Sequence, residues 1–218
     1  MEDDKITDRP TVCPTVPQEM RMNEQDLGPA AEARELMAED TALQLFQIAA
    51  LMLGDEQEAV SLVEESVAKV EADPCADAPL AYVEARSRLV ETAVRRMAGL
   101  YPEAFAVPTA QPANGACIET DDLGAAGLTG ELFGALISGA GRAGMREWLE
   151  RLAPALRAIF VLRAVAGQDG EQTAESLRRS GATGAQAWRR DQVGNAYREA
   201  LCSLATCLMS SRPALMPA

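Results

Sequence analysis

The segment IFVLRAVAGQDGEQTAESLRRSGATGAQAWRR (Ile159–Arg190) has the pattern of two short helices followed by a turn and the start of a third helix. Gly167 can end the first helix. Asp169 can cap the second helix, with Gln172 in the position that completes a capping box. The turn SGATG follows, and its Thr183 can cap the last helix. This order of elements predicts a helix-turn-helix.

The rest of the chain predicts an all-α protein. Of its 218 residues 48% are hydrophobic but only 4% are aromatic, and the abundance of Ala and Leu favours helices over strands. Residues 41–70 and 80–100 place apolar side chains at helical spacing, whereas no segment has a convincing strand pattern. We therefore predict two small helical domains joined by a flexible linker, the C-terminal one a helix-turn-helix.

Segments rich in proline and glycine predict the domain boundaries. The first residues contain DRPTVCPTVPQEM, with three prolines and little apolar patterning, and GLYPEAFAVPTAQPANGACIETDDLGAAG lies between the two helical parts. We predict a disordered or loosely attached arm over 1–40, a helical domain over 41–98, a linker over 99–142, a helix-turn-helix domain over 143–208 and a tail over 209–218.

The composition argues against an enzyme. The chain has no histidine, which removes the Ser-His-Asp and Cys-His arrangements and the usual zinc sites. We therefore predict no catalysis, no cofactor and no metal. No apolar run is long enough to span a membrane, and the acidic N-terminus lacks the apolar part of a secretory signal. We expect a cytoplasmic protein with free thiols at its five cysteines, Cys13, Cys75, Cys117, Cys202 and Cys207.

Charge is distributed unevenly along the chain. The formal net charge is -13, which disfavours contact with nucleic acid. Residues 1–142 have 10 basic and 26 acidic side chains, a net charge of -16, whereas residues 143–218 have 10 and 7, a net charge of +3. Because salt screens charges beyond roughly 10 Å, the local field matters most. The predicted helix-turn-helix lies in the only basic part of the chain.

Two blocks resemble RNA polymerase sigma factors of the extracytoplasmic-function (ECF) type. LFQIAALMLGDEQEAVSLVEESV (residues 45–67) resembles the first conserved region of this family, and RLAPALRAIFVLRAVAGQDGEQTAESL (residues 151–177) resembles the start of its promoter-recognising domain. The likeness covers roughly residues 41–98 and 143–205. It implies a protein that directs transcription initiation, with core RNA polymerase, promoter DNA and an anti-sigma protein as partners.

The resemblance assigns roles to three groups of residues. In the last helix a major-groove contact needs Arg, Gln or Asn on the exposed face. The -35 type residues are Gln186, Arg189, Arg190, Asn195 and Arg198; the -10 type residues are Arg86, Arg88, Arg95 and Arg96; the polymerase-binding residues are Asp55, Glu58, Leu62, Glu64 and Glu65.

Departures from the family pattern leave a second interpretation open. Ser61 replaces an Asp of the signature, Thr92 stands where a later Asp is usual, and the turn ATGA (182–185) lacks the family's lysine. Each lost phosphate contact lowers the slope of log K for DNA binding against log salt concentration by about 0.9. The alternative is a sigma-like regulator or decoy that binds polymerase or an anti-sigma protein without recognising DNA.

Structural interpretations also remain for individual residues. The last-helix arginines can form a solvated face, and the arginines of residues 80–100 can pair with Glu84 and Glu91 at helical spacing. The acidic residues can simply solubilise the surface, and Trp188 is expected in the core. GAGRAG (139–144) matches a dinucleotide-binding fingerprint, but it lacks a convincing preceding strand, so a hinge is the better interpretation.

Overall fold

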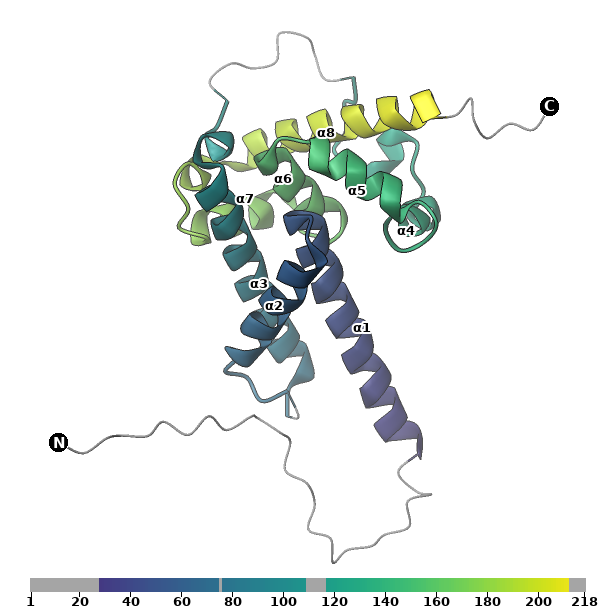
Figure 1. The fold of residues 1–218 in the computed structure, drawn as a ribbon, viewed down its shortest axis with the longest axis vertical. Helices are drawn as coiled ribbons and strands as arrows, with labels where there is room; N and C mark the ends of the chain where they lie inside the picture. The colour runs from purple at the N-terminus through teal and green to yellow at the C-terminus, as the bar shows by residue number, and fades with distance from the viewer. Residues whose placement is uncertain (1–27, 75, 109–116, 212–218) are drawn as a thin grey trace, which may run out of the picture.

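A computed structural model describes residues 28–74, 76–108 and 117–211, and within these residues it contains helices and no strand (Figure 1). The prediction of an all-α protein is confirmed. The α-helices are α1 (Gly28–Leu53), α2 (Glu56–Ala68), α3 (Ala78–Leu100), α4 (Gly130–Ser138), α5 (Arg142–Arg151), α6 (Pro154–Ala164), α7 (Gly170–Arg179) and α8 (Arg190–Ser211). The short 3-10 helices are η1 (Pro102–Phe105), η2 (Leu123–Ala126) and η3 (Ala185–Ala187).

Parts of the predicted arm and of the predicted tail are helical. Residues 28–40 form the first part of α1, and residues 209–211 belong to α8. The rest of the arm, 1–27, and of the tail, 212–218, lies outside the described residues.

Helices α1, α2 and α3 form the N-terminal half. Leu45, Ile48 and Met52 face the core from α1 at helical spacing. Gly54 ends α1 with a φ of 80°, a conformation that glycine adopts without steric cost. Asp55 then caps α2, because its side chain accepts a hydrogen bond of 2.8 Å from the backbone N–H of Glu58.

Helix α6 is the centre of the C-terminal half. Its residues 158–162 are all 0% exposed, as expected for a helix surrounded by other elements. The ring of Phe160 lies 6.2 Å from Phe133 of α4, 4.9 Å from Trp148 of α5 and 6.0 Å from Tyr197 of α8. Three helices are thus joined through one aromatic side chain.

The two halves share one continuous hydrophobic core. Helix α6 packs against α1 and α3, and α7 packs against α3. Figure 1 shows α6 and α7 beside the ends of α1 and α3. This arrangement differs from the expected pair of domains with a flexible connection. The boundaries 41–98 and 143–208 stay predictions.

The described part of the predicted linker, 99–108 and 117–142, contributes to this core. Phe105, Ile118, Leu128 and Phe133 are all buried. The indole N–H of Trp188, itself buried as expected, donates a hydrogen bond of 2.8 Å to the carbonyl of Phe105. Composition predicted a linker because these apolar side chains are isolated among Pro, Gly and Asp and form no periodic pattern.

The capping box at the start of α7 is confirmed. The Asp169 carboxylate accepts a hydrogen bond of 2.8 Å from the backbone N–H of Gln172, and the Gln172 side chain accepts one of 2.9 Å from the backbone N–H of Asp169. Gly167 precedes this box with a φ of 66°. Local sequence therefore determines where α7 begins.

The last helix begins later than predicted, so Thr183 does not cap it. Gly184 has a φ of 85°, and a Cβ there would lie 3.0 Å from the backbone of Phe105 and Ala106. The chain passes through η3 after this close approach, and α8 begins at Arg190. The backbone N–H of Arg189 donates a hydrogen bond of 2.9 Å to the side-chain oxygen of Gln192.

Replacing Asp169 with alanine is expected to lower the free energy of unfolding by about 0.5–2 kcal/mol, because the first backbone N–H groups of α7 lose their acceptor. Asp169→Asn is the matched control, since asparagine caps a helix about as well as aspartate. Urea unfolding followed by circular dichroism measures both variants. An equal loss in the two would show that the cap does not account for the effect.

Candidate nucleic-acid interface

The start of α8 presents three polar side chains to solvent. Gln186 lies in η3, Arg189 precedes α8, and Arg190 is its first residue; all three are exposed. Within the described residues no carboxylate pairs with either guanidinium. The amide of Gln186 makes a long contact of 3.5 Å with the carbonyl of Gly181. These groups are available to an outside acceptor.

The other two predicted DNA-contacting residues are placed differently. Asn195 and Arg198 are half-buried on α8, and the guanidinium of Arg198 donates a hydrogen bond to the Asn195 side-chain oxygen. They lie more than a turn beyond Arg190 along α8. The structure therefore separates the predicted set into an open group at the start of α8 and a partly covered pair.

A disulfide joins α8 to a distant segment. Cys117 and Cys202 are bonded, with their Cα atoms 5.8 Å apart, although they are separated by 85 positions in the sequence. The expectation of free thiols is therefore wrong for these two residues. Wide spacing suggested isolated cysteines, but the fold brings them together. Cys207 is not in a disulfide, and its sulfur lies 3.9 Å from a guanidinium nitrogen of Arg151; Cys13 and Cys75 lie outside the described residues.

Arg163 connects the same distant segment to α6 and α8. Its guanidinium donates a hydrogen bond of 2.7 Å to the Asp121 carboxylate and one of 3.2 Å to the carbonyl of Gln168. It also lies 4.9 Å from the centre of the Tyr197 ring. Burial raises the pKa of Tyr197 to about 12, Arg163 opposes this rise, and the charges of Asp121 and Asp122 add to it. Asp121 was not among the predicted site residues, because it lies in the predicted linker.

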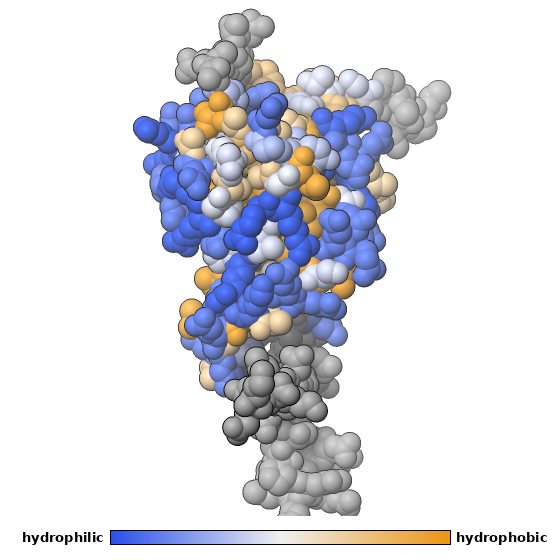
Figure 2. Space-filling view, turned by 60° about the vertical axis from the view of Figure 1, so that its left-hand side comes forward, coloured by the Kyte–Doolittle hydropathy of each residue, from blue (hydrophilic) through white to orange (hydrophobic). Residues whose placement is uncertain are grey.

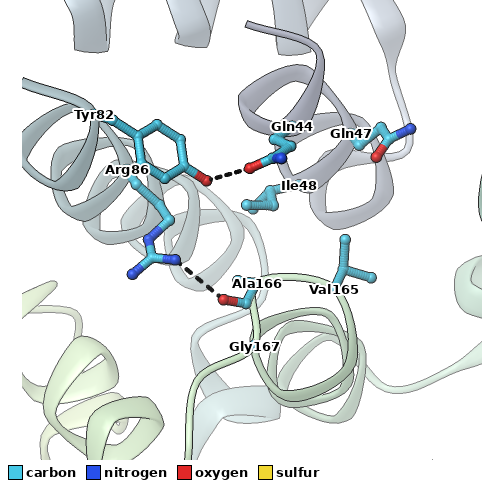
Figure 3. Close-up of a pocket in the computed structure, with 8 residues that line it drawn as sticks. All are labelled: Gln44, Gln47, Ile48, Tyr82, Arg86, Val165, Ala166 and Gly167. Carbon is cyan, nitrogen blue, oxygen red and sulfur yellow. Dashed lines mark hydrogen bonds between the residues drawn. The ribbon is translucent and has the colours of Figure 1, made fainter. Parts of the chain in front are cut away.

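Two of the predicted -10 type arginines bind the C-terminal half. Figure 3 shows Arg86 reaching from α3 to the carbonyl of Ala166, a hydrogen bond of 3.2 Å beside a cavity of about 130 Å³. Its guanidinium also lies 5.5 Å from the centre of the Tyr82 ring. Arg95 donates a hydrogen bond of 3.0 Å to the carbonyl of Ser180, at the end of α7.

The other two arginines of α3 form ion pairs within the N-terminal half. Arg88 lies 2.7 Å from Glu84, as the helical spacing predicted, and 3.4 Å from Glu71. Arg96 lies 2.6 Å from Glu65. In this arrangement all four arginines have partners inside the chain.

The predicted polymerase-binding residues do not form one surface. Leu62 is fully buried on the inner face of α2, so in this arrangement it is not accessible to a partner. It shares the inner face of α2 with Ala59 and Ser66. Glu65 is paired with Lys69 and Arg96, which lower the pKa of its carboxyl group. The exposed members are Asp55, Glu58 and Glu64.

Opposite charges also join the two halves at the start of α2. The Glu56 carboxylate lies 2.9 Å from Arg142 and 3.0 Å from Arg146 of α5. Beside these ion pairs, Asp55 and Glu58 line a cavity of about 480 Å³ that is also bordered by α3, α5 and α6. Figure 2 shows hydrophobic residues exposed among hydrophilic ones on one face of the molecule. The ion pairs of Glu56 with Arg142 and Arg146 thus balance opposite charges where α2 and α5 meet.

The glycine motif does not have the context of a dinucleotide site. Gly139 to Gly144 lies between the end of α4 and the first turn of α5, so a helix precedes it where the fingerprint needs a strand. The part of the chain that the structure describes contains no group of three His, Cys, Asp or Glu side chains arranged to hold a metal ion. It also contains no helix long and apolar enough to cross a bilayer.

Comparison of the chain with protein-family models, with curated proteins and with solved structures gave no match.

Proposed function

We propose that this chain is a diverged ECF-type sigma factor: a cytoplasmic, non-enzymatic protein that binds core RNA polymerase and contacts promoter DNA through α7, the turn and α8. The observation that supports this best is the exposed group at the start of α8. Gln186, Arg189 and Arg190 follow a short capped helix and a turn, and they lie in the basic part of the chain.

The chemistry of this group suits a DNA groove. A guanidinium can donate two parallel hydrogen bonds to a guanine edge or to phosphate oxygens, and a glutamine amide can bind adenine. Because Arg189 and Arg190 have no carboxylate partner among the described residues, neither must break an ion pair before it contacts DNA. The role is binding and positioning, and no covalent step is involved.

A second candidate function rests on the internal contacts of α3. Arg86, Arg88, Arg95 and Arg96 all bind groups of the chain itself. A protein that kept this arrangement would present few cations from α3 to an open promoter. This observation favours the alternative of a sigma-like regulator that binds polymerase or an anti-sigma protein without recognising DNA.

Affinity capture of core RNA polymerase by the intact chain tests both functions. The recovered complex is then titrated with promoter fragments at two salt concentrations. A sigma factor is expected to bind polymerase and to show sequence-dependent DNA binding that weakens steeply with salt. Polymerase binding without DNA binding would favour the regulator. The absence of polymerase binding would contradict both.

A further inference from the structure

The segment 117–126, called here the acidic strap, lies along α8 and is covalently attached to it at one place. Cys117 is bonded to Cys202, and Asp121 approaches α8 at Gly194 while pairing with Arg163. Gly194 and Cys202 are eight residues apart, which is about 12 Å along a helix. The strap therefore runs antiparallel to α8 over about two turns, and its helix η2 packs on α8.

The acidic strap covers one side of the predicted DNA-contacting helix. Positions four residues apart lie on the same side of a helix, so Gly194, Arg198 and Cys202 form one row and Asn195 lies next to it. Asn195 and Arg198 are half-buried, whereas Arg189 and Arg190, which lie before this row, are exposed. The partly covered pair of the interface is therefore the pair that the acidic strap borders.

The charge of the acidic strap opposes DNA. Glu119, Asp121 and Asp122 all belong to it. Carboxylates beside α8 repel phosphates at close range and reduce the positive potential of the only basic part of the chain. With the strap in place, a duplex that approaches this side of α8 would meet the exposed carboxylate of Asp121 near Gly194.

We propose that the Cys117–Cys202 disulfide is a redox switch that controls access of DNA to α8. This inference rests on the proposed function, because it assigns regulation to the same interface. In the oxidised chain the bond holds the acidic strap against Asn195 and Arg198. In the reduced chain the strap keeps only non-covalent contacts, among them the buried Ile118 and the ion pair of Asp121 with Arg163, so it separates from the helix more readily. Disulfides in cytosolic proteins are usually transient and redox-sensing, which fits the proposed cytoplasmic location.

The chemical step is thiol–disulfide exchange with a dithiol reductant. One thiolate of the reductant attacks a sulfur of the Cys117–Cys202 bond and forms a mixed disulfide, which releases the other cysteine as a thiolate. The second thiol of the reductant then displaces the remaining cysteine. Two electrons and two protons pass to the protein, which gains two thiols, and the reductant becomes a disulfide.

The test compares the oxidised and reduced full-length chain with Cys117→Ser, which cannot form the bond, and with Cys207→Ser as the matched control. Thiol alkylation followed by mass measurement establishes the bond in each sample. Hydrogen exchange of the amides of 117–126 reports the position of the strap independently of DNA. Binding of a mixed-sequence DNA duplex at low salt reports access to α8.

Reduction is expected to accelerate hydrogen exchange of the amides of 117–126 and to strengthen DNA binding by about tenfold. The carboxylates of the strap would move away from α8 and repel phosphates less, and the side chains of Asn195 and Arg198 would become available to DNA. Cys117→Ser should bind like the reduced chain and ignore the reductant, whereas Cys207→Ser should respond like the natural chain. These results together would support the switch.

Three outcomes would overturn the proposal, and they separate its failure from that of the proposed function. Equal DNA binding in both redox states would leave DNA binding intact and remove the switch. Accelerated exchange without DNA binding in either state would show that the proposed function fails, and control of DNA access fails with it. Alkylation of both Cys117 and Cys202 in oxidised protein would show that the bond does not form.

Discussion

Replacing both Arg189 and Arg190 with alanine is expected to weaken binding of duplex DNA by at least about tenfold and to reduce the salt dependence of binding. Each phosphate contact contributes about 0.9 to the slope of log K against log salt, so the loss of two contacts lowers the slope by about 1.8. Both side chains are exposed and lack a carboxylate partner among the described residues. Their removal should therefore leave the fold unchanged. Titration of a fluorescent duplex over a range of salt concentrations measures both quantities.

The matched control removes two other positive charges, in Lys69→Ala with Arg151→Ala. These side chains are 58% and 60% exposed; Lys69 directly follows α2 and Arg151 is the last residue of α5. The control should change DNA affinity far less than the α8 variant. Equal weakening in the two would mean that only net charge governs binding. An α8 variant that binds like the natural chain would favour the regulator without DNA recognition.

Replacing Phe160 with alanine is expected to lower the free energy of unfolding by about 3–5 kcal/mol, as is usual for removal of a fully buried aromatic ring. The ring contacts aromatic side chains from α4, α5 and α8, so the cavity would adjoin several elements that cannot all move inward. Denaturant unfolding followed by circular dichroism and by tryptophan fluorescence measures the change. Leu132→Ala, at a side chain that is 47% exposed, should change stability by less than about 1 kcal/mol.

The same experiment tests whether the two halves unfold together. Helix α6 packs on α1 and α3 as well as on α7 and α8, so a single transition detected by both probes is expected. Two transitions in the natural chain, with only one moved by Phe160→Ala, would show instead that the halves are independent domains.

Local patterns predicted much of the secondary structure. The apolar spacing around Leu45 and Ile48 marked α1, and the pairing of Asp169 with Gln172 marked the start of α7. These features depend on residues a few positions apart, which a single sequence displays directly. The predicted cap at Thr183 was wrong because the backbone of Phe105, about 80 positions earlier, determines the path of the chain near Gly184.

The residues of the candidate site were predicted from the local positive charge and from a helix expected to begin near Thr183. The structure leaves Arg189 and Arg190 exposed, although α8 begins only at Arg190. The disulfide of Cys117 with Cys202 and the ion pair of Asp121 with Arg163 join residues 85 and 42 positions apart. No spacing rule relates such residues, so composition assigned their segment to a linker.

The hydrogen bonds from α3 to the C-terminal half also act as helix caps supplied from another helix. Arg86 reaches the carbonyl of Ala166, just past the end of α6, and Arg95 reaches the carbonyl of Ser180 at the end of α7. The carbonyl end of a helix carries partial negative charge and lacks internal donors, so a guanidinium there satisfies both needs. Any partner that draws α3 away would remove both caps in one movement. A partner that bound the N-terminal half and moved α3 in this way would loosen the ends of α6 and α7, the two helices that precede α8. A change in the position of α3 would thus reach the C-terminal half through these two hydrogen bonds.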